Sequence, residues 1–349
     1  MPEPRGNPDL FGHEGTERDL LAAWNGGRLP HAWLIGGISG IGKATLAIRF
    51  ARFVLANGAK SGPPPSSLYI SPEHPVFKRV RAGAHADMLT VERRFDEKRG
   101  KMKTDIAVDD VRQVSGFFHR TTAEGGWRVV VIDGVEQMNA SGHNALLKII
   151  EEPPERALLL LVTEAPGGLL PTIRSRCRKL SLEPLSEVVV NDLLCRHRPD
   201  ITYADSQALS RLSEGSIGHA LNLAGAGGLD LYRQMIKMLA TLPRLDLRAA
   251  HVFADSLTRK GDDAVWETAT ALLVWWLARL VRTLARGEVP VEIVAGETAL
   301  VIRLAANSLD RWLEVWENIV RLFARANSAN LDRKHVMLTA LLGIEAAAD

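Results

Sequence analysis

The sequence predicts an α/β domain of the P-loop type, built on a parallel sheet and followed by a small helical lid and a C-terminal all-α domain. Three observations predict this fold. Up to about Leu182, short apolar runs alternate with amphipathic helical patterns, which is typical of a parallel sheet covered on both faces. A glycine-rich loop, Gly37 to Lys43, follows the first apolar run and opens a helical pattern. Beyond Leu182 the pattern is almost entirely helical.

The expected strands are the apolar runs "AWLIGG", "DMLTVER", "WRVVVIDG" and "ALLLLVTEA". A stretch rich in Pro, Gly and Ser, Asn57–Pro75, interrupts the alternation and is expected to be an exposed insertion. A length of 349 residues suits two or three domains. We expect them at 1–182 for the α/β domain, 183–228 for the lid and 229–349 for the helical domain.

Two helical patterns are specific enough to test. In "VDDVRQVSGFFHRTT", Val111, Val114, Phe117 and Phe118 fall on one helical face, and Asp109 is the expected N-cap. The segment "ADSQALSRLSEGSIGHALNLAG" reads as two small helices joined at Glu214-Gly215-Ser216. Long amphipathic helices from Leu229 onward carry most of the tryptophans, at a spacing more typical of a core than of an interface.

Composition excludes several classes of protein. The balance of 43 basic and 41 acidic residues argues against a chain whose main task is wrapping nucleic acid. Two cysteines, Cys177 and Cys195, cannot form a disulfide framework and suit a reducing cytoplasm. The first residues lack the pattern of an export signal, and the apolar stretch Ala271–Val281 is too short to span a bilayer and contains Arg279. We therefore expect a cytoplasmic protein without a membrane segment.

The loop Gly37-x-x-x-x-Gly42-Lys43 has the composition of a phosphate cradle. Its glycines let backbone N–H groups converge on phosphate oxygens, and the lysine supplies a positive charge. The next residue, however, is Ala44, where a hydroxyl normally holds magnesium. Thr45 lies roughly 100° further round the helix and is a poor substitute. The loop therefore predicts either weak nucleotide binding or a strand–helix connector that binds none.

The run "RVVVIDG" ends in Asp133, in the manner of a strand whose terminal aspartate reaches a metal ion. The residue that would orient the attacking water is replaced by Gly134, and Glu136 lies past the strand end. The plainer alternative is a buried strand whose aspartate caps the next helix. Two losses at one site predict that this chain alone does not hydrolyse ATP.

The block Asn144–Ser186 resembles the clamp-loader branch of the AAA+ ATPases, and within it the delta-prime subunits of bacterial DNA polymerase III. Those subunits belong to the assembly that opens the sliding clamp and places it on primed DNA. The residues that carry the likeness are Asn144-Ala145-Leu146-Leu147-Lys148, Glu151-Glu152-Pro153-Pro154 and Ser175-Arg176-Cys177. "LFGHE", "GRLPHAWLIGG", "AGAHADMLTV" and "ANLDRK" share it, so the resemblance runs from residue 10 to beyond residue 330.

By this resemblance, Arg176 is an arginine finger that reaches the γ-phosphate of ATP held by a neighbouring subunit. A planar, permanently charged guanidinium suits that task. The plainer reading is a solvated basic edge formed by Arg174, Arg176 and Arg178. Thr163 matches the family's polar sensor, whereas Gly218 stands where motor subunits place a second-sensor arginine. The degenerate nucleotide site implied by the family and the loop comprises Gly37, Gly40, Gly42, Lys43, Thr45, Asp133 and Thr163.

Many relatives carry four cysteines as a small zinc module after the P-loop helix. The corresponding stretch, roughly Ala51 to Arg81, contains none, and His74 and His85 cannot close a tetrahedral site alone. We expect no zinc. ATP or ADP is expected to bind weakly if it binds, without hydrolysis.

The resemblance implies a delta-prime-like subunit of the DNA polymerase III holoenzyme, a DNA-directed DNA polymerase and nucleotidyltransferase, that supplies a rigid scaffold, a finger in trans and a collar domain. The implied partners are the ATPase motor subunits, the clamp-opening subunit and, through the complex, the sliding clamp and primed DNA. No two-metal polymerase site is visible in this chain. Two alternatives stay open: an ATP-hydrolysing, gamma/tau-like motor subunit, and an unrelated P-loop kinase or GTPase.

Overall fold

The computed structural model describes residues 3–58, 62–96, 101–124, 126–258, 263–289, 291–329 and 331–349. The chain divides into two compact units. Unit 1 comprises Met1–Val190 with Gly215–Gly218, and unit 2 comprises Asn191–Glu214 with His219–Asp349. The finer division into three domains with boundaries near residues 182 and 228 stays a prediction.

Unit 1 is built on a five-stranded parallel sheet in the order β2-β5-β6-β1-β7. The four apolar runs expected as strands are strands, which confirms the α/β class. The fifth, β7, is an edge strand that the hydrophobic pattern does not predict, because three of its four residues are exposed and polar. The strands are β1 (Ala32–Gly36), β2 (Met88–Val91), β5 (Arg128–Asp133), β6 (Ala157–Thr163) and β7 (Arg178–Ser181), with a separate antiparallel pair β3 (Phe95–Asp96) and β4 (Lys101–Met102).

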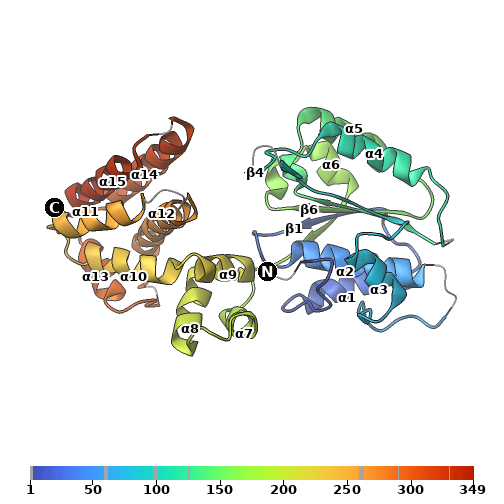
Figure 1. Ribbon diagram of the computed structural model, residues 1–349, viewed down its shortest axis with the longest axis horizontal. Coiled ribbons are helices and arrows are strands. Elements are labelled where there is room, and N and C mark those ends of the chain that lie inside the picture. The colour runs from blue at the N-terminus through green and yellow to red at the C-terminus, as the bar shows by residue number, and fades with distance from the viewer. Residues whose placement is uncertain are drawn as a thin grey trace. The chain divides into compact units, whose positions relative to one another are not determined.

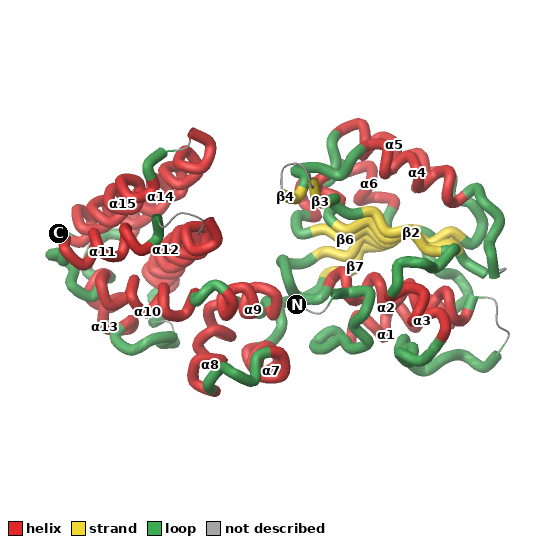
Figure 2. Tube along the Cα trace, in the orientation of Figure 1, coloured by secondary structure: helices red, strands yellow, loops and turns green. Residues whose placement is uncertain are grey.

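Helices cover both faces of this sheet (Figures 1 and 2). Because successive side chains of a strand point to opposite faces, Trp33 and Ile35 of β1 join one apolar cluster, and Ala32 and Leu34 join the other. One face carries α1 (Glu14–Asn25), α2 (Lys43–Asn57) and α3 (Pro75–Arg81); the other carries α4 (Val108–Phe118), α5 (Ala140–Glu151) and α6 (Pro171–Arg176). The short 3-10 turns η1 (Val135–Gln137) and η2 (Pro166–Gly168) follow β5 and β6.

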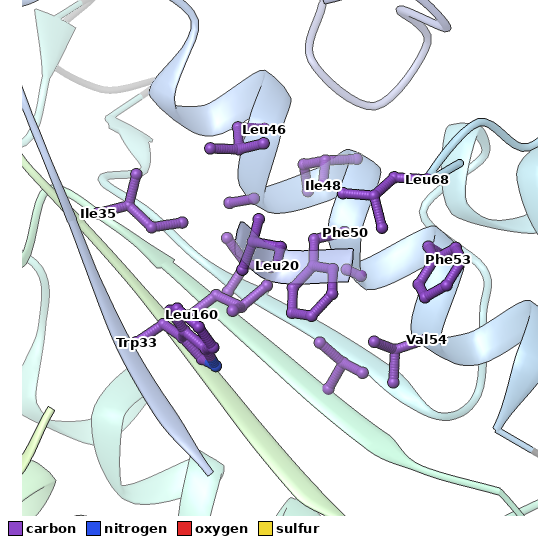
Figure 3. Close-up of a cluster of buried hydrophobic side chains, with 14 of the residues drawn as sticks. Leu20, Trp33, Ile35, Leu46, Ile48, Phe50, Phe53, Val54, Leu68 and Leu160 are labelled. Atoms are coloured by element: carbon purple, nitrogen blue, oxygen red, sulfur yellow. The ribbon is translucent and has the colours of Figure 1, made fainter. Parts of the chain in front are cut away.

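The helix after the glycine-rich loop, α2, is buried almost all round and is not the amphipathic helix that the sequence predicts. Figure 3 shows Leu46, Phe50 and Phe53 of α2 in one apolar cluster with Trp33 and Leu160 of the sheet. Two arginines on its other side fasten the N-terminal segment. Arg52, 1% exposed, donates to Asn7 O at 2.6 Å, and Arg49 bonds Pro8 O and the Glu17 carboxylate. The polar residues Arg49 and Arg52 of α2 are therefore buried and hold the N-terminal segment, and they do not form a solvated face.

The helix α4 confirms its predicted face and corrects its predicted start. Val111, Val114, Phe117 and Phe118 are all buried. The N-cap is Ala107 and not Asp109. Asp109 lies in the first turn, where a carboxylate favours the positive end of the helix, and its Oδ1 lies 3.2 Å from Arg112 Nη1.

The Pro-rich stretch carries no helix or strand between residue 62 and the start of α3. Residues 59–61 lie outside the described part of the chain. The stretch is not uniformly exposed, because Leu68 is buried in the α2 core cluster.

Unit 2 is helical throughout its described elements. The predicted pair of small helices joined at Glu214-Gly215-Ser216 is confirmed. Of the tryptophans in the long helices, Trp266, Trp276 and Trp312 are fully buried, so they serve the core as their spacing predicts. The helices are α8 (Tyr203–Leu212), α10 (Gly228–Leu239), α11 (Leu247–Ser256), α12 (Asp263–Arg286), α13 (Glu297–Leu304), α14 (Leu309–Ala329) and α15 (Arg333–Ala348), while α7 (Glu187–His197) and α9 (Ile217–Gly225) cross the division between the units.

A buried polar cluster links three segments of unit 2. Glu297, 1% exposed, accepts hydrogen bonds from Tyr232 Oη at 2.6 Å, Arg279 Nη1 at 2.9 Å and the Ile293 backbone N–H at 2.9 Å. The guanidinium of Arg279 also lies over the Trp275 ring. Burial raises the pKa of Tyr232 above its ordinary value, and the negative charge of Glu297 raises it further.

One helix among the described residues, α12, is long and apolar enough to cross a membrane by length and composition. The stretch judged too short from the sequence is part of this 24-residue helix. Core helices of soluble proteins pass the same test, and Trp266, Trp276 and Leu277 of α12 are buried within unit 2.

Candidate functional site

The glycine-rich loop joins the end of β1 to the start of α2, as the sequence predicts. Gly37, Gly40 and Gly42 have φ of 152°, 73° and 105°, a backbone region that favours glycine. At Gly40 the space is also closed. A Cβ there would lie 2.5 Å from Ser216 Oγ and 2.8 Å from Gly218 Cα. The loop thus has the backbone of a phosphate cradle but is packed against the segment Gly215–Gly218.

Every carbonyl from Ile38 to Ile41 accepts a hydrogen bond from within unit 1. These bonds fix the loop from three directions: its own helix, the N-terminal segment and the Gly215–Gly218 segment. The donors are Lys43 Nζ to Ile38 O (2.6 Å), Ser216 Oγ to Ser39 O (2.7 Å), Gly218 N to Gly40 O (2.9 Å) and the His13 ring Nε2 to Ile41 O (2.7 Å). Gly218, noted in the sequence only for the arginine it lacks, therefore contributes its backbone N–H to the loop.

Lys43 is turned toward its own chain. Its side chain is 6% exposed, and its ammonium bonds Ile38 O and lies 3.9 Å from Glu164 Oε1. Burial lowers the pKa of Lys43, while the carboxylates of Glu164, Asp133 and Glu136 oppose that shift. The charge that a P-loop offers to phosphate is here already engaged by a carbonyl and a carboxylate.

Asp133 lies at the carboxyl end of β5, beside a small cavity of about 210 Å³. That volume is below the roughly 300 Å³ at the lower end of small-molecule pockets. Carboxylates dominate its lining, with Glu92, Asp133, Glu136 and Glu164 against the single cation Arg93. Burial raises the pKa of Asp133 to about 6, and Glu92, Glu136 and Glu164 add to the rise. These carboxylates make the lining of the cavity acidic.

The site does not fit the magnesium nucleotide that the loop motif implies. Ala44 offers no side-chain oxygen to bind magnesium, and Thr45 is buried within α2. Thr163, the expected polar sensor, is fully buried, and its hydroxyl accepts the N–H of Ala165 at 3.2 Å. Across the described ranges, no group of three or more His, Cys, Asp or Glu side chains could hold a metal ion. His74 caps α3 by accepting from the Val76 N–H.

We expect Asp133→Asn to stabilise the protein at alkaline pH. The pKa of Asp133 is raised to about 6 in the folded state from 3.8, so the proton favours folding and stability falls as pH rises from about 4 through 6. Removing the charge should add about 1–3 kcal/mol to the free energy of unfolding at pH 8 and nothing below pH 4. Urea denaturation of both proteins at pH 4, 6 and 8 measures this; a pH-independent difference would contradict the assignment.

Arg176 lies at the end of α6, just before the edge strand β7. Its side chain is 42% exposed. Nη1 donates to Thr172 O at 3.2 Å, and Nη2 lies 3.1 Å from Glu151 Oε1 at the end of α5. Cys177 is buried, and burial raises the pKa of its thiol to about 11.

The parallel register separates Arg176 from the glycine-rich loop. The loop starts after Gly36, which pairs with Thr163 of β6 and with Ser181 at the end of β7. Arg178 at the start of β7 pairs with Trp33, three residues earlier and about 10 Å along the strand. Gly37, Asp133 and Thr163 therefore gather at the carboxyl edge of the sheet, while Arg176 lies toward the amino edge. Arg176 and the chain's own Lys43 do not form one site.

The family model described as "DNA polymerase III, delta subunit" matches residues 12–186. Among curated proteins, DNA polymerase III subunit delta' of Pseudomonas aeruginosa is 33% identical over 233 residues, covering 66% of this chain and 67% of that protein. Subunit delta' of Escherichia coli is 32% identical over 207 residues, 58% of this chain and 57% of that protein. Subunit tau of Escherichia coli is 29% identical over 288 residues, 77% of this chain but 42% of that protein.

Among solved structures, a DNA polymerase III gamma subunit-related protein from Thermotoga maritima is 17% identical with a TM-score of 0.38. The match covers 95% of this chain and 100% of that protein's chain. A RuvB variant from the same organism is 17% identical with a TM-score of 0.41, and the match covers 90% of each chain.

Proposed function

The chain belongs to the delta-prime-like family of DNA polymerase III clamp-loader subunits, and on that premise we propose that it works as a stationary subunit with a trans-acting arginine finger. It supplies a rigid scaffold to the complex and extends Arg176 to the γ-phosphate of ATP held by a neighbouring motor subunit. The guanidinium stabilises charge on the transferring phosphoryl group.

One observation carries this proposal: Arg176 is exposed at the amino edge of the sheet, whereas the chain's own loop is at the carboxyl edge. A finger so placed cannot serve its own nucleotide and requires one from another chain. The glycine-rich loop supports the same division of labour, because Lys43 bonds Ile38 O and faces Glu164 instead of an open cradle.

A gamma/tau-like motor is the second candidate. The matched stretch of subunit tau of Escherichia coli covers 77% of this chain, more than either delta' protein above. A motor must bind and hydrolyse ATP itself. Hydrolysis by the purified chain therefore separates the two candidates.

We expect the purified chain not to hydrolyse ATP, and we expect the Ala44→Thr variant not to hydrolyse it either. The substitution restores one oxygen, but Gly134 and Gly218 still lack the side chains that act on water and on the γ-phosphate, and Lys43 keeps its bond to Ile38 O. Steady-state phosphate release by both proteins with Mg-ATP is the measurement. Turnover by the wild-type chain that disappears with Lys43→Ala would favour the motor. Turnover that appears only with Ala44→Thr would show that the losses at Gly134 and Gly218 are not decisive.

The proposed partners are the motor and clamp-opening subunits, and through the complex the sliding clamp and primed DNA. We place this function in the bacterial cytoplasm, because the similar proteins are subunits of bacterial DNA polymerase III. The chain contributes to a polymerase holoenzyme without performing polymerisation itself. The division at residues 182 and 228 and the collar role of the helices beyond are part of the proposal.

A further inference from the structure

We infer that Glu151 is the positioning residue for Arg176, holding its guanidinium in the orientation that meets the neighbour's phosphate. The inference rests on the proposed function, because it assigns a role in the reaction that Arg176 serves. Glu151 lies at the end of α5, and its Oε1 is 3.1 Å from Arg176 Nη2.

Two elements hold the guanidinium. Glu151 of α5 engages Nη2, and Thr172 O in the first turn of α6 engages Nη1 at 3.2 Å. Because the guanidinium is planar, fixing two of its nitrogens fixes its plane. Thr172 alone would leave the group free to rotate about a single hydrogen bond.

The anchored side chain still has donors for a ligand. A guanidinium carries five N–H groups, and two acceptors on this chain occupy two of them. With 42% of the side chain exposed, the remaining donors are open to phosphate oxygens. Contact with Glu151 and contact with phosphate are therefore compatible.

The position of Glu151 is itself constrained. Pro153 and Pro154 follow Glu152 and cannot continue the helix, so α5 ends at Glu151. A carboxylate at the negative end of a helix is unfavourable unless a cation offsets it. Arg176 supplies such a cation from α6, in addition to Lys148 in the last turn of α5. The ion pair joins the end of α5 to the end of α6. It therefore fixes the position of the Arg176 backbone as well as the orientation of its side chain.

The neighbouring Glu152 offers a matched control. It has the same charge, is also exposed, and has no side-chain partner among the contacts of the described residues. A general loss of surface charge would affect Glu151→Ala and Glu152→Ala alike. A positioning role affects Glu151→Ala alone.

The test uses the complex reconstituted with the motor and clamp-opening subunits of the same organism. Glu151→Ala should lower kcat for ATP hydrolysis about two- to tenfold, the range for leaving one long side chain unordered, with KM for ATP unchanged. Glu151→Gln keeps an acceptor oxygen and should retain most of the rate. Glu152→Ala should match the wild type.

A double variant makes the test specific. In an Arg176→Ala background, Glu151→Ala should have no further effect, because the residue acts only through Arg176. An equal loss in that background, or a rise in kcat with Glu151→Ala alone, would overturn the inference. If Arg176→Ala is damaging but Glu151→Ala is neutral, the inference fails and the proposed function stands. If Arg176→Ala is itself neutral, the proposed function fails.

Discussion

Replacing Arg176 with alanine is expected to slow ATP hydrolysis at the neighbouring site that it serves by about 10³- to 10⁵-fold. The side chain stabilises charge that develops on the transferring phosphoryl group, so its loss raises the barrier without removing the nucleotide. Single-turnover hydrolysis by the reconstituted complex measures this, because ATP at the affected site should persist while other sites react. Clamp loading should fail in parallel.

Two control variants separate the finger from general basic charge. Arg178→Ala removes an equal charge from the exposed start of β7, two residues away, and should leave hydrolysis unchanged. Arg176→Lys keeps the charge but loses the planar fork, and should recover little of the rate. Sedimentation of each complex establishes that assembly survives. A slow Arg178→Ala complex beside a normal Arg176→Ala complex would refute the assignment.

Replacing Glu297 with alanine is expected to destabilise unit 2 by about 3–5 kcal/mol. The carboxylate accepts from Tyr232, Arg279 and the Ile293 backbone at 2.6–2.9 Å while it is 1% exposed. Its removal leaves a largely buried guanidinium without a counter-charge, and it leaves the buried Tyr232 hydroxyl and the partly buried Ile293 N–H without this acceptor. Urea denaturation followed by circular dichroism measures the loss.

Glu288→Ala is the matched control, since this exposed glutamate follows α12 and has no side-chain partner among the contacts of the described residues. Its effect should stay within about 0.5 kcal/mol. A loss below about 1 kcal/mol for Glu297→Ala would show that the cluster is solvated and does not hold α10, α12 and α13 together.

Much of the α/β unit could be predicted from the sequence because its signals are local. Buried parallel strands read as continuous apolar runs, and the glycines of the loop are required by positive φ at Gly40 and Gly42. The buried face of α4 followed from the spacing of Val111, Val114, Phe117 and Phe118. The start of α4 could not be predicted in the same way. Ala107 caps the helix without a side-chain hydrogen bond, and an aspartate such as Asp109 is as suitable for the first turn as for the N-cap.

Features that depend on distant segments could not be predicted in this way. Arg49 and Arg52 resemble a polar helix face, but the N-terminal segment and the rings of Tyr69 and Phe77 bury them. The edge strand β7 has one buried residue in four, too few for a hydrophobic pattern. At the site, the hydrogen bond from Gly218 N–H to Gly40 O joins segments far apart in the sequence, so no local motif records it.

A structure of the complete clamp-loading complex with a non-hydrolysable ATP analogue tests the trans-acting role of Arg176 most directly. We expect the Nη atoms of Arg176 to lie within about 3 Å of a γ-phosphate oxygen of the ATP analogue bound to the adjacent subunit, with Glu151 still in contact. A guanidinium facing solvent, remote from every bound triphosphate, would contradict it.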